Sequence, residues 1–185
     1  MFAFASAMSY CKGLLMLTGC LSYLSLYLCL YVLLCWVGPP FQLSGYDMLG
    51  VAVWVCGMCI EHTADMQKSR WNSKHKSNQQ KTWLASGLWA WSRHPNFFGE
   101  HVIWWGSAIV AMAGLTAPGA DASYAPFGCA LAVISPLWSS FFLFFTSLML
   151  LEKRLDAKFG GKPAYERYKR ETSVFFPWPP SATKP

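Results

Sequence analysis

The longest uncharged stretch of this chain, from Gly13 to Val37, is the feature that most restricts its fold. It exceeds the ~20 residues that a helix needs to cross the ~30 Å hydrocarbon core of a bilayer. A second uncharged run, Tyr124 to Leu151, is also long enough, despite Pro126 and Pro136. Only 13% of the residues are charged, whereas a water-soluble domain usually carries about 25%. The chain is therefore expected to lie in a membrane.

Two shorter apolar runs lie between the long ones, at Met48–Ile60 and Val102–Leu115, and each can be extended by a few residues. They bring the number of expected crossings to about four. We therefore predict an all-α, polytopic membrane helix bundle that forms a single domain over residues 1–185. Its transmembrane helices are expected at 13–37, 46–64, 97–116 and 124–151, followed by a tail at 152–185.

The positions of Lys and Arg predict the orientation of the bundle. Apart from Lys12, all of them fall in segment 62–95 or in the tail, and the loops near 38–45 and 117–123 hold none. Four crossings place both basic regions on one side, which the positive-inside rule makes cytoplasmic. The composition is typical of a protein of the endoplasmic reticulum membrane or a bacterial inner membrane. The expected partners are the lipid bilayer and a hydrophobic small molecule, with no nucleic acid.

The predicted cytoplasmic boundary is rich in polar and aromatic residues. Segment 69–82 consists largely of Ser, Asn, Gln, Lys and His, which is typical of a solvated loop or a fraying helix end. Many tryptophans cluster near this boundary, and we interpret them mainly as an aromatic belt that anchors the helices at headgroup level. They are Trp71, Trp83, Trp89, Trp91, Trp104 and Trp105.

Cysteines give little indication of a special site. Cys56 and Cys59 have the spacing of metal ligands, but no second pair accompanies them. We interpret them as small hydrophobic residues within a membrane helix. Neither a metal site nor a structural disulfide framework is predicted.

The first of three polar clusters, Glu61–Lys68, directly continues the second apolar run. On a helix, Glu61, Asp65 and Lys68 fall on one face. Ionisable groups at a membrane edge either reach water or belong to a functional site. This cluster alone favours neither interpretation.

The second cluster begins at Arg93, just before the third apolar run. Pro95 suits the first position of a helix, so the free backbone N–H groups there would favour an anion such as phosphate. Arg93 and His94 would add positive charge or hydrogen bonds beside it. Asn96 and Glu100 share a face that points into the bundle, where a buried Glu100 needs partners. The alternative is a basic interface anchor followed by one tolerated acid.

The third cluster continues the fourth apolar run and includes Glu152, Arg154, Tyr165 and Tyr168. Its basic residues could bind phosphates or could be attracted to anionic lipid, and alone the lipid interpretation is favoured. Taken together, the three clusters are predicted to meet on one side of the bundle. A long anionic cofactor could lie there, with its reactive end between the helices.

Three ordered motifs resemble a known family, the DUF1295 branch of the steroid 5-alpha-reductase-like membrane proteins. The resemblance covers most of residues 46–177. Its motifs are Glu61…Ala64–Lys68, Gly87–Glu100, and a C-terminal signature of Leu150–Arg154, Phe159-Gly160, Tyr165, Tyr168 and Thr172–Pro177.

The resemblance implies an all-helical fold shared with sterol reductases and isoprenylcysteine carboxyl methyltransferases. It implies that NADPH lies in a cytoplasm-facing cavity and delivers hydride to a carbon–carbon double bond conjugated to a carbonyl, in a steroid-like or lipid-like enone. Such a protein is an oxidoreductase acting on CH–CH groups. No catalytic residue is assigned. The residues implied to contact the cofactor are Arg93, His94, Asn96, Glu100, Glu152, Arg154, Tyr165 and Tyr168.

The chain departs from the family pattern in two places. Family members usually carry Tyr where this chain has Phe97, so one hydroxyl is missing. They also usually begin with additional helices, which in the steroid reductases carry the residues that bind the substrate carbonyl. This chain is therefore expected to be a short paralogue, a fragment or an incomplete sequence.

Two other functions stay open at this point. An S-adenosylmethionine-dependent methyltransferase of the isoprenylcysteine type has similar motifs, although the C-terminal signature and the many basic residues favour the reductase. A non-catalytic membrane scaffold or fragment is the other alternative. The substrate and the oligomeric state are left undefined, because an apolar bundle accepts many hydrophobic molecules.

Overall fold

The computed structural model describes residues 43–75, 82–119, 123 and 125–180, and within these ranges the chain is helical and has no β-strand. The predicted all-α class is confirmed. The predicted span 13–37 and residues 76–81 and 181–185 lie outside the described residues. The elements are α2 (Gly45–Lys74), the 3-10 helix η1 (Gly87–Ala90), α3 (Pro95–Leu115), α4 (Ala125–Phe142), the π-helix η2 (Leu143–Leu148), α5 (Met149–Phe159) and α6 (Pro163–Glu171).

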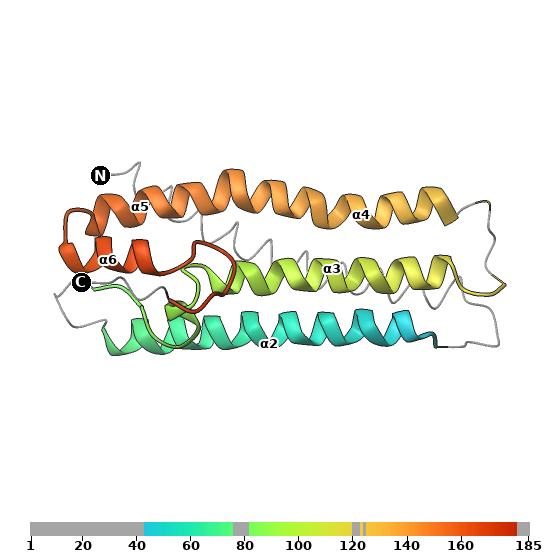
Figure 1. The fold of residues 1–185 in the computed structure, drawn as a ribbon, viewed down its shortest axis with the longest axis horizontal. Coiled ribbons are helices and arrows are strands. Elements are labelled where there is room, and N and C mark those ends of the chain that lie inside the picture. Colours follow the sequence, from blue (N-terminus) through green and yellow to red (C-terminus); the bar gives the residue numbers. More distant parts are fainter. Residues whose placement is uncertain (1–42, 76–81, 120–122, 124, 181–185) are drawn as a thin grey trace.

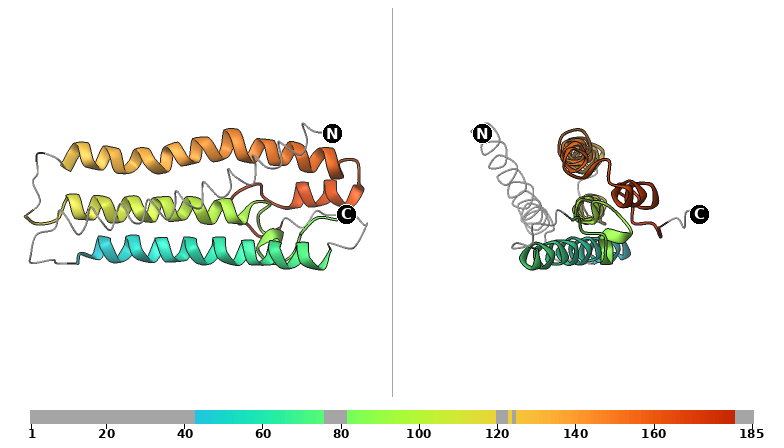
Figure 2. Two further views of the ribbon diagram at one scale, coloured as in Figure 1. Left: turned by 180° about the vertical axis from the view of Figure 1, so that it is seen from behind. Right: turned by 90° about the vertical axis from the view of Figure 1, so that its left-hand side faces the viewer.

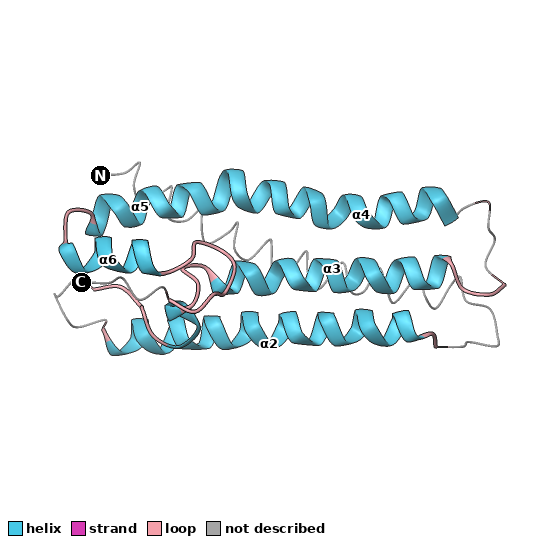
Figure 3. Ribbon diagram, viewed as in Figure 1, coloured by secondary structure: helices cyan, strands magenta, loops and turns pink. Residues whose placement is uncertain are grey.

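The three long helical segments lie side by side, with α3 between α2 and α4 (Figures 1 and 2). The three long helical segments, α2, α3 and the run from α4 to α5, alternate in direction, so the end of α2, the start of α3 and all of α5 and α6 come together at one end of the bundle (Figure 1). The loops that connect them also gather at this end (Figure 3). We call this region, residues 61–75, 82–101 and 149–178, the polar end.

The contact between α2 and α3 is built from small residues at heptad spacing. A Cβ atom on Gly99 would lie only 2.5 Å from the backbone nitrogen of Glu61, and one on Gly57 would lie 2.7 Å from that of Ile103. Small residues allow helix backbones to approach this closely, as they do in membrane helix pairs. The buried small residues of this seam are Gly50, Gly57 and Ala64 on α2 and Gly99, Gly106 and Ala113 on α3.

One continuous helix among the described residues, Ala125–Phe159, is long and apolar enough to cross a bilayer. It combines α4, η2 and α5, and so extends past the predicted boundary at Leu151. Its outward face exposes large apolar side chains such as Phe127, Trp138 and Phe145. A fully folded helix with such a face needs an apolar neighbour, either lipid or protein.

The helix boundaries partly correct the sequence-based expectations. Pro95 is the first residue of α3, as predicted, and α3 closely matches the predicted segment 97–116. Helix α2 begins with a capping box between Ser44 and Asp47 and continues to Lys74. Of the two alternatives predicted for 69–82, the loop is wrong for residues 69–74, which form the end of α2. Those residues include no Gly or Pro that would end a helix.

The expected tail is also more structured than predicted, because it folds back onto the rest of the polar end. Trp83 packs edge-on against Phe159 and Tyr165, with ring centroids 5.6 and 5.2 Å apart. Trp89 is only 6% exposed and donates a hydrogen bond to the carbonyl of Ala64 at 3.0 Å. Trp89 therefore packs inside the protein and Trp83 is half-buried against the tail, so the aromatic-belt interpretation, which was expected to explain most of the tryptophans, does not apply to Trp89.

Candidate functional site

The centre of the polar end is a carboxylate that holds two basic side chains. Oε2 of Glu152 lies 2.6 Å from Nη1 of Arg93, and Oε1 of Glu152 lies 2.7 Å from Nε2 of His94. Arg93 and His94 are 8% and 4% exposed, so the ion pair is largely removed from water. Glu152 follows the π-helix η2. Such a wider turn changes the direction in which the following side chains point, and is frequent at functional sites.

The hydrogen bond to Glu152 defines the protonation of His94. A carboxylate only accepts, so Nε2 carries the proton, and the neutral ring leaves Nδ1 as an acceptor. Burial lowers the pKa of His94, and the charges of Lys68 and Arg93 lower it further, while the bond to Glu152 opposes this shift. The ring also stacks on Phe97, with centroids 5.7 Å apart.

Phe97 itself is buried in an apolar cluster with Leu143, Leu148 and Phe175. A tyrosine hydroxyl at this position would need a hydrogen-bond partner among apolar side chains. The packing therefore accounts for phenylalanine at the position where relatives are expected to carry tyrosine.

Residues 172–178, which we call the C-terminal strap, fix the backbone that carries Arg93. The amide of Arg93 donates to the carbonyl of Ser173 at 2.8 Å, next to an isolated bridge between Ser92 and Ser173. The Ser92 hydroxyl, which is fully buried, donates to the carbonyl of Phe175 at 2.8 Å. The C-terminal strap therefore positions the start of α3.

Helix α2 joins the site from the other side. The ammonium of Lys68 lies 5.2 Å from the ring centroid of Trp89, and its charge acts on His94. The Asn96 side chain lies close enough to Asp65 to stabilise its charged form. The predicted meeting of the three polar clusters is thus confirmed, because α2, the start of α3 and α5 all contribute side chains to one region.

Two buried polar atoms of this region have no hydrogen-bond partner among the described residues. They are Nε of Arg93, a donor, and Oδ1 of Asn96, an acceptor. Asn96 is 6% exposed and Glu100, one turn further along α3, is 5% exposed. Unpaired buried polar atoms are uncommon and are usually explained by a water molecule, an ion or a ligand. Their complementary character suits a ligand group that both donates and accepts.

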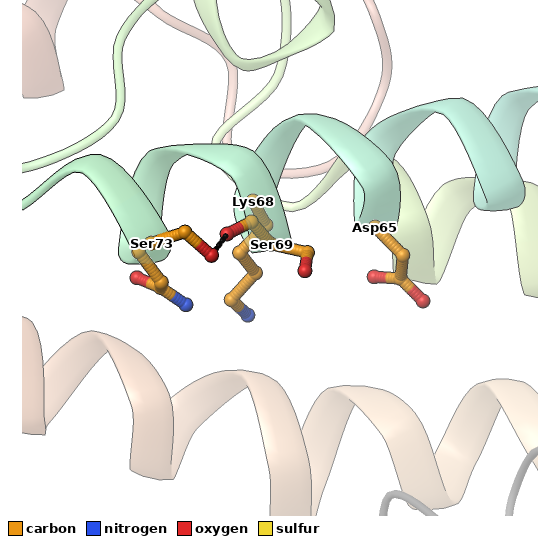
Figure 4. Close-up of a pocket in the computed structure, with 5 residues that line it drawn as sticks. Asp65, Lys68, Ser69 and Ser73 are labelled. Atoms are coloured by element: carbon orange, nitrogen blue, oxygen red, sulfur yellow. Dashed lines mark hydrogen bonds between the residues drawn. The ribbon is translucent and has the colours of Figure 1, made fainter. Parts of the chain in front are cut away.

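A wide-open cavity of about 500 Å³, closer to a surface groove than to an enclosed pocket, lies along the last turns of α2. Its volume lies within the ~300–1,000 Å³ range of small-molecule sites. Figure 4 shows the side chains of Asp65, Lys68, Ser69 and Ser73 on the same side of the helix, with the Ser73 hydroxyl bonded to the carbonyl of Ser69. Asn72 completes the lining.

Sequence reasoning missed the cavity residues beyond Lys68, because segment 69–82 was expected to be a solvated loop or a fraying helix end. Asp65, Ser69 and Ser73 follow one another at a spacing of four residues, and Asn72 lies three residues after Ser69, which places them on one face of a helix. That spacing was the available signal.

Helix α6 brings the two predicted tyrosines to the same end. The Tyr168 hydroxyl donates to the carbonyl of Trp89 at 2.7 Å. Burial raises the pKa of Tyr168 well above its usual value, so this hydroxyl stays protonated. The Tyr165 hydroxyl donates to Asp156 at 3.2 Å, and Lys169 pairs with the same carboxylate at 2.7 Å.

The eight predicted site residues therefore fall into three groups. Arg93, His94 and Glu152 contact one another directly. Three further residues lie nearby: Asn96 is next to Asp65, Tyr165 is bonded to Asp156, and Tyr168 is bonded to the carbonyl of Trp89. Glu100 is buried on α3, and Arg154 is half-buried on α5 without a hydrogen bond or ion pair to another described residue.

The comparison with protein-family models confirms the DUF1295 part of the resemblance inferred from the motifs. The model of a family described as "Protein of unknown function (DUF1295)" matches residues 7–172. The comparisons with curated proteins and with solved structures found no match. Because the family model covers most of the chain, the chain belongs to the DUF1295 family.

Proposed function

We propose that this chain is a membrane-embedded, NADPH-dependent reductase of a carbon–carbon double bond in a steroid-like or lipid-like enone. The observation that carries the proposal is the meeting of three polar clusters around Glu152, beside the cavity on α2. The family assignment supports it only in outline, since the family's activity is not defined.

The membrane location rests on the distribution of apolar surface. The helix Ala125–Phe159 exposes a long apolar face, and α2 exposes Tyr46, Met48, Leu49, Val51 and Val55. Apolar patches of this extent are rare on water-soluble monomers and favour a lipid neighbour. In the proposed topology four helices cross the bilayer, including residues 13–37, and the polar end faces the cytoplasm together with the basic residues.

The side chains present fit the chemical groups of NADPH. Its carboxamide both donates and accepts, which matches the unpaired acceptor of Asn96 and the unpaired donor of Arg93. Its ribose hydroxyls suit Ser69, Asn72 and Ser73 along the cavity. Lys68 would pair with a phosphate at the same wall.

The residues of the site would orient the cofactor rather than react with it. Bound NADPH would supply a hydride to the double bond. Glu152 holds the side chains of Arg93 and His94 in place, and the C-terminal strap holds their backbone. The tight seam between α2 and α3 keeps Asp65 and Asn96 in register.

One observation favours a second candidate, an S-adenosylmethionine-dependent methyltransferase. Glu152 engages both Arg93 and His94, and Glu61, Asp65 and Glu100 lie close enough to interact electrostatically. The site is therefore less positive than the sequence predicts, which suits a cofactor with fewer negative charges.

Calorimetry on the detergent-purified chain tests these alternatives with NADPH, NADH and S-adenosylmethionine as separate ligands. We expect NADPH to bind at micromolar strength and NADH much more weakly. Lys68→Ala should weaken NADPH binding, whereas Lys153→Ala, at an exposed position of α5, should leave it unchanged. Binding of S-adenosylmethionine alone would establish the second candidate. Binding of no ligand by folded protein would contradict both and leave the non-catalytic interpretation.

A further inference from the structure

Large aromatic side chains are exposed where the C-terminal strap meets the start of α3. Trp91, Phe176 and Trp178 are 49%, 63% and 72% exposed. Neither Phe176 nor Trp178 belongs to a helix, so their exposure is not the outward face of a membrane-spanning segment. None of the three belongs to the site around Glu152.

These side chains come from two segments that contact each other, and we call the three of them the patch. The amide of Trp178 donates to the carbonyl of Trp91 at 3.0 Å, which joins the two segments. The Phe176 ring packs against Phe98 in the first turn of α3, with centroids 5.9 Å apart. The patch therefore lies at the level of the first turn of α3, where the apolar helix segments end and the polar residues begin.

The backbone beneath the patch is also unusually poor in free hydrogen-bond donors. Pro177, Pro179 and Pro180 have no N–H group, and the N–H of Trp178 is already bonded to Trp91. Residues 177–180 therefore carry no unpaired backbone N–H group into a less polar medium, where each such group would be costly. Tryptophan and other aromatic rings prefer the boundary between the apolar and headgroup layers of a bilayer.

We propose that Trp91, Phe176 and Trp178 insert into the lipid interface and anchor the C-terminal strap to the membrane surface. The strap holds the backbone of Ser92 and Arg93, so lipid binding by the patch stabilises the frame of the candidate site. This inference rests on the membrane location proposed above, and it does not depend on which cofactor binds.

Fluorine NMR on the full chain in phospholipid nanodiscs tests the proposal. All tryptophans are labelled with 5-fluorotryptophan, and four resonances are assigned by single replacement with phenylalanine at Trp89, Trp91, Trp138 and Trp178. Spectra are recorded with a lipid that carries a nitroxide near the headgroup, and separately with a water-soluble gadolinium chelate. Trp138, exposed on α4, reports on lipid contact by the bundle, and buried Trp89 is the negative control.

We expect the lipid nitroxide to remove most of the intensity of the Trp91 and Trp178 resonances, while the soluble chelate leaves them largely intact. Loss of Trp178 intensity to the chelate alone would mean that the patch faces water, and would overturn the proposal. Insensitivity to both agents would mean that protein covers the patch, and would overturn it as well. If the lipid nitroxide still quenches the Trp138 resonance in either of these two cases, the proposed membrane location is not contradicted. A Trp138 resonance unaffected by lipid would contradict the membrane location itself.

Discussion

The two ends of the bundle differ in what holds them together. In the apolar part, α2 and α3 touch through glycine and alanine, and the outer faces expose large apolar side chains. At the polar end, charged groups are buried, and segments far apart in the sequence are joined by hydrogen bonds, as between His94 and Glu152. The apolar part therefore depends on close backbone packing, whereas the polar end depends on a few specific pairs. Substitutions in the two regions should differ accordingly.

The largest effect is expected from Glu152→Gln, which leaves the buried charge of Arg93 without its partner. We expect a loss of about 3 kcal/mol in the free energy of unfolding, the usual scale for breaking a buried pair. The matched control is Asp156→Asn, which breaks the more exposed pair with Lys169 and should cost less than about 1 kcal/mol. Loss of helicity in denaturing detergent measures both. Equal costs would show that burial does not distinguish the two pairs.

The next effect is expected from Gly57→Ala in the part of the helix seam that belongs to the apolar part. The added Cβ would lie 2.7 Å from the backbone nitrogen of Ile103, so α2 and α3 must move apart. We expect a loss of about 2 kcal/mol, typical of overpacking. Gly45→Ala is the control, because no atom lies within 4 Å of its added Cβ. If both variants unfold like the wild type under the same denaturing titration, the close approach of the helices is wrong.

A smaller effect is expected from Tyr168→Phe, which removes the hydrogen bond to the carbonyl of Trp89. The cost should be about 1 kcal/mol, the net value of one such bond. Tyr46→Phe, at a position 71% exposed, serves as the control. A loss of stability with Tyr46→Phe as large as with Tyr168→Phe would argue against a docked α6.

The smallest effect is expected from pH. Burial holds the pKa of His94 below its ordinary value of 6.5, so the folded state favours the neutral ring. The resulting stability is complete above pH 6.5 and is lost as the pH falls toward the lowered value. His94→Gln should flatten this part of the stability profile. An unchanged profile in the variant would mean that other groups cause the pH dependence.

The contrast between the apolar part and the polar end also explains which features of the structure could be predicted from the sequence. The spans of α3 and most of α2 follow from runs of apolar residues and from Pro95, which are local signals. The residue types of the site and their convergence were also predictable, because each polar cluster directly borders an apolar run. The seam was visible in principle, since its glycines recur at heptad spacing.

The pairing of side chains within the site could not be predicted in the same way. Arg93 and Glu152 are brought together by the whole helical hairpin, and the π-helix between Phe142 and Met149 sets the direction of α5. Composition does not indicate a π-helix. The cavity residues Ser69 and Ser73 were missed for a different reason, because polar residues without Gly or Pro can either continue a helix or leave it.

Hydrogen exchange on the chain in nanodiscs, with and without NADPH, tests most directly whether the polar end is a cofactor site. We predict that saturating NADPH slows exchange in peptides that cover residues 65–73 and 88–94, and leaves residues 45–57 of the apolar part unchanged. S-adenosylmethionine should produce no such protection. No slowing with NADPH, or slowing confined to residues 45–57, would contradict the account.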